Sequence, residues 1–256
     1  MKINQIPIFS NFLTSKLLIT FNIKFFYFIE TDNQNKQNNL NLLQKMKFEI
    51  LEDFLSCSFQ SHQKLELQFS GSYMIDKRIA SLCTGLANCI NLINLEINLS
   101  ASQINDQRLL SICQTLGNLD GLQSLSIYLQ QSNIFFCFYS NQIGESGLFY
   151  LSSALNDLQN IQNLNISLSE NKITNKAIIE FGSSLKSCLN LQVLKITLGW
   201  NQINSQAAFS FCKCLSELKK VSNVSLNFQF NEVYNSTCLK RTLKKYPRLV
   251  MLNIQI

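Results

Sequence analysis

The chain has 256 residues, of which 46% are hydrophobic and 15% charged, and its formal net charge is +6. This hydrophobic fraction, with only two prolines, is typical of a folded globular chain and excludes a disordered or collagen-like one. The single histidine, His62, excludes a metal site built from several imidazoles, and we expect it to be a surface or cap residue.

The first 47 residues differ in pattern from the rest and are predicted to form an N-terminal extension. Residues 17–29 are apolar apart from Asn22 and Lys24, but this run is short for a membrane span and no small-residue cleavage site follows it. A targeting or anchor segment, a strand that caps the fold and a disordered extension all remain open. Residues 31–41 are predicted to be a polar linker.

Residues 48–256 are predicted to form one repeat domain that opens with a cap helix. Phe48, Leu51, Phe54 and Leu55 have the spacing of one helical face. Terminal units of a repeat array need such a cap because their outer side has no neighbour.

A period of 30 residues governs the rest of the chain. Four asparagines recur at this spacing, and each is followed two positions later by isoleucine or valine, which indicates an array of one supersecondary unit. Inside such a stack the amides are expected to donate hydrogen bonds to carbonyls of the adjacent turn. The four residues of this predicted ladder are Asn141, Asn171, Asn201 and Asn231.

Each unit combines two hydrophobic periods. Alternation such as Leu95 and Ile97 predicts a strand with one buried face, and the spacing of Ile79, Leu82 and Leu86 predicts a helix. Six such units are counted, followed by a closing strand at the end of the chain. Polar residues in one register are predicted to be helix N-caps: Asp76, Asp106, Glu145, Asn175, Ser205 and Asn235.

The unit reads L-x-x-L-x-I-x-L-x-x-N-x-I, and the stretch NQIGESGLFYLSSALNDLQN at 141–160 is similar to N-x-I-G-D-E-G-x-x-x-L-x-x-A-L. The chain therefore resembles the leucine-rich repeat family, in particular its ribonuclease-inhibitor-like branch. That resemblance implies an α/β solenoid (horseshoe) with a parallel concave sheet and outer helices. One departure is an extra apolar/polar pair before the asparagine, which predicts strands longer by one alternation, or a bulge.

Two aromatic features interrupt the regular pattern. Nine extra residues between Leu129 and Asn141 form a predicted loop that, if exposed, would contact another molecule. Packing over a neighbouring turn and a translated intron are the favoured alternatives. Trp200 and Phe230 share one phase and are expected to stack, with core or rim packing favoured over ligand binding. The aromatic loop residues are Phe135, Phe136, Phe138 and Tyr139.

The nine cysteines are predicted to be mostly buried free thiols of a cytoplasmic protein. Cys212 with Cys214 is the one close pair, a weak metal signal, and no metal or cofactor is expected. Nucleotide-binding and hydrolase motifs are missing from the sequence, so we do not expect an enzyme. Six cysteines occupy core phases of the repeat: Cys83, Cys89, Cys113, Cys188, Cys212 and Cys238.

Surface recognition is the remaining function. The outward strand positions are polar and weakly charged, which suits a hydrogen-bonding interface with a protein partner on the concave sheet. Tyr128 is the best candidate for an affinity anchor. The expected partner-binding residues are Glu66, Glu96, Asn98, Tyr128, Asn165, Lys195, Thr197 and Asn227.

Other functions remain open beside this scaffold or adaptor. The runner-up is an enzyme regulator, as in the ribonuclease inhibitors and GTPase activators of the family branch. A lower alternative is an RNA- or membrane-associated module, because seven basic residues gather between Lys219 and Arg248. The closing strand, 249–256, would leave an open edge through which a second chain could associate.

Overall fold

The computed structural model describes residues 45–131, 141–244 and 248–256. These residues form one parallel sheet of eight strands, which lie in chain order with each strand hydrogen-bonded to the next. The extension up to residue 44 and the predicted aromatic loop at 132–140 lie outside the described residues. The strands are β1 Lys45–Phe48, β2 Lys64–Gln68, β3 Asn94–Asn98, β4 Ser124–Tyr128, β5 Asn163–Ser167, β6 Val193–Thr197, β7 Asn223–Asn227 and β8 Met251–Gln255.

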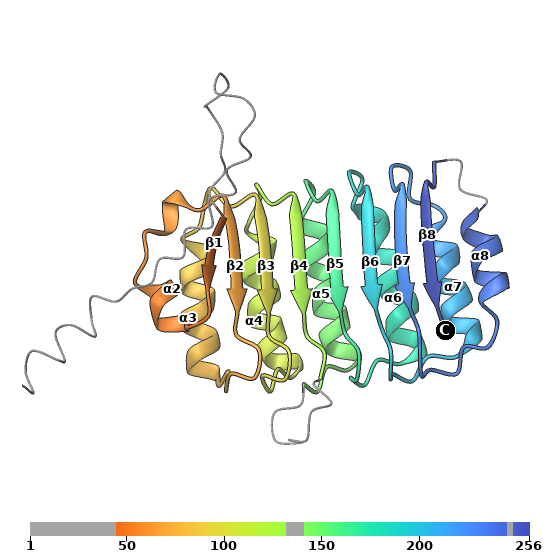
Figure 1. Cartoon of the computed structure of the whole chain (residues 1–256), viewed down its shortest axis with the longest axis horizontal. Helices are drawn as coiled ribbons and strands as arrows, with labels where there is room; N and C mark the ends of the chain where they lie inside the picture. Colours follow the sequence, from red (N-terminus) through yellow and green to blue (C-terminus); the bar gives the residue numbers. More distant parts are fainter. Residues whose placement is uncertain (1–44, 132–140, 245–247) are drawn as a thin grey trace, which may run out of the picture. The chain divides into compact units, whose positions relative to one another are not determined.

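Helices alternate with the strands and lie on one side of the sheet (Figure 1). Each helix packs against the helices of the adjacent units. This is the predicted fold class, an α/β leucine-rich repeat solenoid. The helices are α2 Leu51–Leu55, α3 Asp76–Ala87, α4 Asp106–Gly117, α5 Glu145–Asp157, α6 Asn175–Ser184, α7 Ser205–Leu215 and α8 Ser236–Lys244, with 3-10 turns η1 Phe59–Ser61 and η3 Leu185–Ser187.

The core lies between the sheet and the helices. Leu95 is paired in register with Leu65 on one side and Leu125 on the other, so identical positions of successive units stack in rows. All three leucines are buried, as are Ile79 and Leu82 on the facing side of α3. Burial of these rows supplies the main driving force for stacking one unit on the next.

The extra apolar/polar pair adds hydrogen bonds between adjacent units. Beyond β5, the Leu168 N–H donates to the Thr197 carbonyl at 2.8 Å and the Glu170 N–H to the Gly199 carbonyl at 2.8 Å. The same two bonds recur beyond β2, β3, β4 and β6. Strands β2 to β8 each span five residues and end before the extra apolar residue, so the pair extends the hydrogen bonding between units beyond the strands and not the strands themselves.

The first strand, β1, was not anticipated. It pairs in parallel with β2 and ends at Phe48, the residue at which the cap helix was predicted to begin. The helix itself, α2, starts at Leu51. The repeat period misses β1 because its unit contains only a one-turn helix, so β1 and β2 begin 19 residues apart (64 − 45) instead of 30.

The helix N-caps lie one residue earlier than predicted for every helix but α8. Asn105, Thr174 and Asn204 cap α4, α6 and α7 by accepting from the N–H three residues later. Of the predicted caps, only Asn235 does so, accepting from the Cys238 N–H at 3.1 Å. The prediction was wrong for the first residues of five helices: Asp76, Asp106, Glu145, Asn175 and Ser205.

Three of those helix-entry residues bind the next unit instead of their own helix. Asp106 Oδ1 accepts from the Gly144 N–H at 2.8 Å, and Asn175 Oδ1 accepts from the Asn204 N–H at 2.8 Å. Ser205 Oγ accepts from the Tyr234 N–H at 3.0 Å. Each of these side chains accepts a hydrogen bond from the backbone near the start of the next unit's helix. A polar residue is therefore needed at this position although it does not cap its own helix.

A second row of polar side chains, the asparagine ladder, crosses the stack at the turns that follow the strands. Asn201 Nδ2 donates to the carbonyls of Leu168 and Leu198, both at 2.9 Å, while its Oδ1 accepts from the Ile173 N–H at 2.9 Å. Asn141, Asn171 and Asn231 make equivalent bonds to the preceding unit. In the β3 unit the position is held by Ser102, a residue that the asparagine pattern did not reveal.

Candidate functional site

The side of the sheet opposite the helices carries three rows of mostly polar side chains, here called the open face. It consists of the first, third and fifth residues of β2 to β8, with Lys45 and Lys47 of β1, and the strand register aligns them across the sheet. All eight predicted partner-binding residues lie on it. Because sheet pairing places neighbouring residues of one row about 4.8 Å apart, the open face presents polar groups in a regular grid.

The N-terminal end of the open face is an ion-pair network. Lys45 on β1 forms a salt bridge with Glu66 on β2 and lies 3.8 Å from a carboxylate oxygen of Glu96 on β3. Lys47 Nζ lies 3.8 Å from Glu66. Burial alone would raise the pKa of Glu66, but the hydrogen bond and charge of Lys45, with Gln68 and Lys47, hold that pKa below its ordinary value. Both carboxylates therefore have charge partners that the sequence prediction lacked, because β1 was not foreseen.

Amide side chains extend this network toward the C-terminal ends of the strands. Gln68 Nε2 donates to Glu66 at 3.2 Å, and Asn98 Nδ2 donates to Gln68 Oε1 at 3.0 Å. Asn98 Oδ1 in turn accepts from the Ser100 hydroxyl at 2.7 Å. The side chains on this half of the open face are thus held in fixed positions by one another.

Tyr128 and Asn165 form the centre of the open face. Asn165 Nδ2 donates to the Tyr128 hydroxyl at 3.0 Å, and both residues are half-buried. Burial and the nearby charge of Glu96 raise the pKa of Tyr128, so this hydroxyl is neutral at physiological pH. The side-chain oxygen of Asn165 is buried and accepts no hydrogen bond from any described residue.

The C-terminal half of the open face is less constrained. Lys195 is exposed, with Asn165 and Ser225 as its neighbours in the row. Asn227 Nδ2 donates to Gln255 Oε1 on β8 at 2.9 Å. Of the predicted residues, Thr197 makes no side-chain hydrogen bond to a described residue.

Trp200 and Phe230 stack at the strand ends beside the open face. Their ring centroids are 4.2 Å apart, with an angle of 19° between the planes. The predicted stacking is confirmed, but Trp200 is 52% exposed and Phe230 64% exposed, so the pair belongs to the rim and not to the core.

The chemistry of the sulfur and imidazole groups favours packing over reactivity. Burial raises the pKa of Cys89 and Cys212 to about 12 and that of Cys188 to about 11. Cys238 is exposed, contrary to the expectation of a core position, because α8 begins one residue later in the repeat than the other helices. Within the described ranges, no group of three or more His, Cys, Asp and Glu side chains is arranged to hold a metal ion.

His62 is buried rather than a surface residue. Its Nε2 lies 3.0 Å from Cys57 Sγ, and its ring meets Phe48 edge-on. Burial lowers the pKa of His62, so the imidazole is neutral near pH 7. The residue belongs to the packing beneath β1, which the sequence did not predict.

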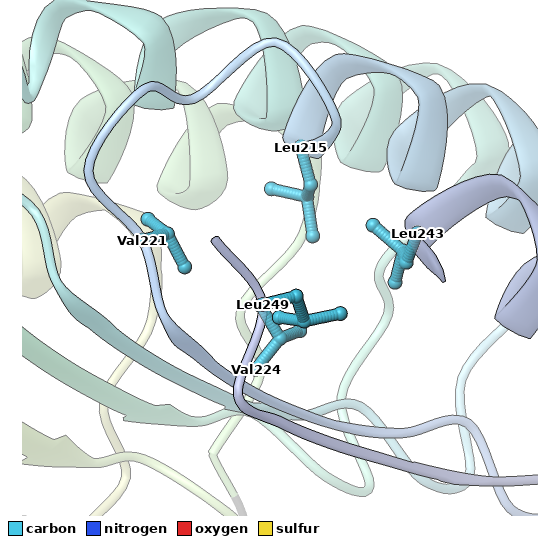
Figure 2. A pocket seen from close by; sticks show the side chains of 5 residues that line it. All are labelled: Leu215, Val221, Val224, Leu243 and Leu249. Atoms are coloured by element: carbon cyan, nitrogen blue, oxygen red, sulfur yellow. The ribbon is translucent and has the colours of Figure 1, made fainter. Parts of the chain in front are cut away.

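An apolar gap lies between α7, α8 and β7 (Figure 2). Its five lining side chains are Leu215, Val221, Val224, Leu243 and Leu249. Since its lining among the described residues is leucine and valine alone, that lining offers no group that could orient a polar ligand or catalyse a reaction. None of the helices in the described part of the chain is long and apolar enough to span a bilayer.

No protein-family model and no curated protein matches the chain. Among solved structures, internalin C2 from Listeria monocytogenes is similar at 18% identity and a TM-score of 0.43, over 77% of this chain and 62% of the internalin chain. The actin-binding site 2 of leiomodin-1 is similar at 15% identity and a TM-score of 0.47, over 64% of this chain and 84% of the leiomodin chain. Both TM-scores are below 0.5.

Proposed function

We propose that the chain is a scaffold or adaptor that binds a protein partner on the open face. The observation that carries this proposal is a polar sheet face, eight strands wide, that no described helix covers. Mutual hydrogen bonds already position side chains from its N-terminal end to its centre. Side chains that are ordered before binding lose little conformational entropy when a partner docks.

The centre of the open face supports the same function. A buried acceptor without a donor is costly, and Asn165 Oδ1 is such a group among the described residues. A partner that moves the covering side chains aside and donates a hydrogen bond to this oxygen would remove the cost. Tyr128, next to it, offers the aromatic surface and polar tip that interface anchors commonly have.

We further propose that the role is non-catalytic and cytoplasmic, with the repeat type of the ribonuclease-inhibitor-like branch. In support, the one imidazole is buried, and six thiols have pKa values raised by burial. A nucleophilic thiol would need a lowered pKa, and a general base would need to be reachable by a substrate. The pattern at 141–160 and the presence of a multi-turn helix in each unit from β2 onward support the choice of branch.

Affinity capture with matched variants tests the interface. The test variant replaces Tyr128, Asn165 and Lys195 on the open face with alanine. The control replaces Gln114, Phe209 and Lys213, exposed residues on the helices with similar chemistry, with alanine. Loss of the same protein from the test variant alone supports the proposal. Equal capture by both variants would place the interface elsewhere.

A further inference from the structure

The exposed ring pair at the rim, Trp200 with Phe230, has no evident structural purpose. More than half of each side chain is exposed, although the rings cover one another. Large aromatic side chains at the margin of a proposed interface are the residue types that dominate binding energies. The open face itself provides only Tyr128 of this kind.

The backbone at both positions strengthens this argument. Trp200 has φ of 57° and Phe230 has φ of 59°, in the left-handed region that residues with a Cβ adopt at a conformational cost. The same turn position in the β2 unit is held by Gly71, with φ of 70°, which adopts it without that cost. Ala101 and Glu170 adopt the same conformation at this position, with φ of 52° and 56°, so the turn accepts side chains of different size and does not require two aromatic rings.

The residues near Phe230 in the chain and on the adjoining strand supply acceptors and a carboxylate. Asn227 Nδ2 donates to both Gln229 Oε1 at 3.0 Å and Gln255 Oε1 at 2.9 Å, which gathers two amide oxygens at this edge. Glu232 lies two residues beyond Phe230, is exposed, and forms no ion pair with a described residue. A flat ring face, amide oxygens and a negative charge together match a planar cation with several donors.

We infer that the Trp200–Phe230 pair receives an arginine side chain of the protein partner held on the open face. This rests on the proposed function. The guanidinium extends the stack on an outer ring face, its N–H groups reach the amide oxygens, and Glu232 balances its charge. Lysine has no plane to stack and fewer donors, so arginine is the better fit.

The first experiment separates binding from folding. Trp200→Gly and Phe230→Gly each remove a ring and also remove the left-handed strain, so melting temperatures within about 4 °C of wild type are expected. Capture of the partner should weaken about tenfold or more. Tyr234→Ala is the matched control, because Tyr234 is an 80% exposed aromatic residue four positions beyond Phe230. It should change capture less than twofold.

The second experiment identifies the group that docks. Photo-reactive benzoylphenylalanine in place of Phe230 should crosslink the captured protein within a few residues of an arginine. Changing that arginine to glutamine should weaken binding about tenfold, and lysine should restore only part of it. Since Trp200 is the sole tryptophan, its fluorescence in the wild type should also change when the partner binds.

Several results would overturn the inference. Unfolding of both glycine variants would show that the ring pair is needed for the fold. Crosslinks confined to this chain or to arginine-free segments of the partner would contradict docking of an arginine. If the open-face variant loses the partner while both glycine variants retain it, the proposed function stands and this inference fails. If only the glycine variants lose it, the arginine contact stands and the open-face proposal fails.

Discussion

The side-chain oxygen of Asn201 accepts a hydrogen bond of 2.9 Å from the backbone N–H of Ile173, a residue of the preceding unit. The amide of Asn201 also donates to the Leu168 carbonyl of that unit. One side chain thus satisfies a backbone donor and a backbone acceptor of its neighbour. Since unpaired buried polar groups are costly, the ladder contributes directly to stability.

Replacing Asn201 with leucine is therefore expected to lower the free energy of unfolding by about 1 to 3 kcal/mol. The loss arises because the Ile173 N–H and the carbonyls of Leu168 and Leu198 would keep no side-chain partner. Denaturant unfolding followed by circular dichroism measures it. Asn163→Leu, at an exposed strand position, is the control and should stay within about 0.5 kcal/mol. Equal effects of the two substitutions would contradict a structural role for the ladder.

Gly147→Ala should destabilise the protein although alanine is the better helix former. A Cβ at this position would overlap Asp106 Oδ1 and lie 2.7 Å from Ile143 Cγ2. Moving the carboxylate would break its bond to the Gly144 N–H, so a net loss of about 1 to 2 kcal/mol is expected after the helix preference is subtracted. Thermal unfolding beside Ser146→Ala, an exposed neighbour in the same turn, tests this. An unchanged melting temperature would show that the helix entry is loosely packed.

Stability should fall on acidification through His62. Burial lowers the pKa of this imidazole below its ordinary value of 6.5, so the unfolded chain binds the proton more readily than the folded one. The stabilisation is complete above about pH 6.5 and is lost as the pH falls through the lower, folded-state pKa. Urea unfolding of wild type and His62→Leu at pH 8, 7, 6 and 5 should show a difference that changes with pH only below about 6.5. If the difference in unfolding free energy between the two proteins did not change with pH, the pKa of His62 would be the same in the folded and unfolded chains.

Thiol labelling should separate the cysteines by burial. At pH 7.5 an alkylating reagent is expected to modify Cys238, which is exposed, well before Cys89, Cys188 and Cys212. The thiolate is the reactive form, and the pKa values of the three buried thiols, about 11 to 12, leave a very small fraction of it. Mass spectrometry of each cysteine peptide over time gives the rates. Labelling of Cys212 as fast as Cys238 would contradict the packing of α7.

The repeat itself was predictable because two periods coincide in each unit. Alternation at Leu95 and Ile97 and helical spacing from Ile79 to Leu86 each specify a buried face, and the 30-residue spacing makes these faces stack. Where the period changes, prediction failed. β1 belongs to a unit with a helix of only five residues, and Cys238 is exposed because α8 starts one residue late.

The positions of polar residues were less predictable than those of apolar ones. Asp106 and Asn175 have the composition of N-caps, but their partners are backbone N–H groups almost one repeat away or further, which no local pattern reveals. Lys45 and its ion pair with Glu66 depended on the unforeseen β1. The left-handed conformation of Trp200 and Phe230 was not predicted, because aromatic residues seldom adopt it.

The asparagine ladder gives the array a direction. Each of these side chains reaches backward, so Asn171 supports the backbone of Ile143 and Asn201 supports that of Ile173. Replacing one ladder asparagine therefore leaves a backbone N–H of the preceding unit without its side-chain acceptor. The asparagine of the following unit is still present and keeps its own hydrogen bonds. Substitution of one ladder asparagine is therefore expected to destabilise the unit on its N-terminal side before the unit on its C-terminal side.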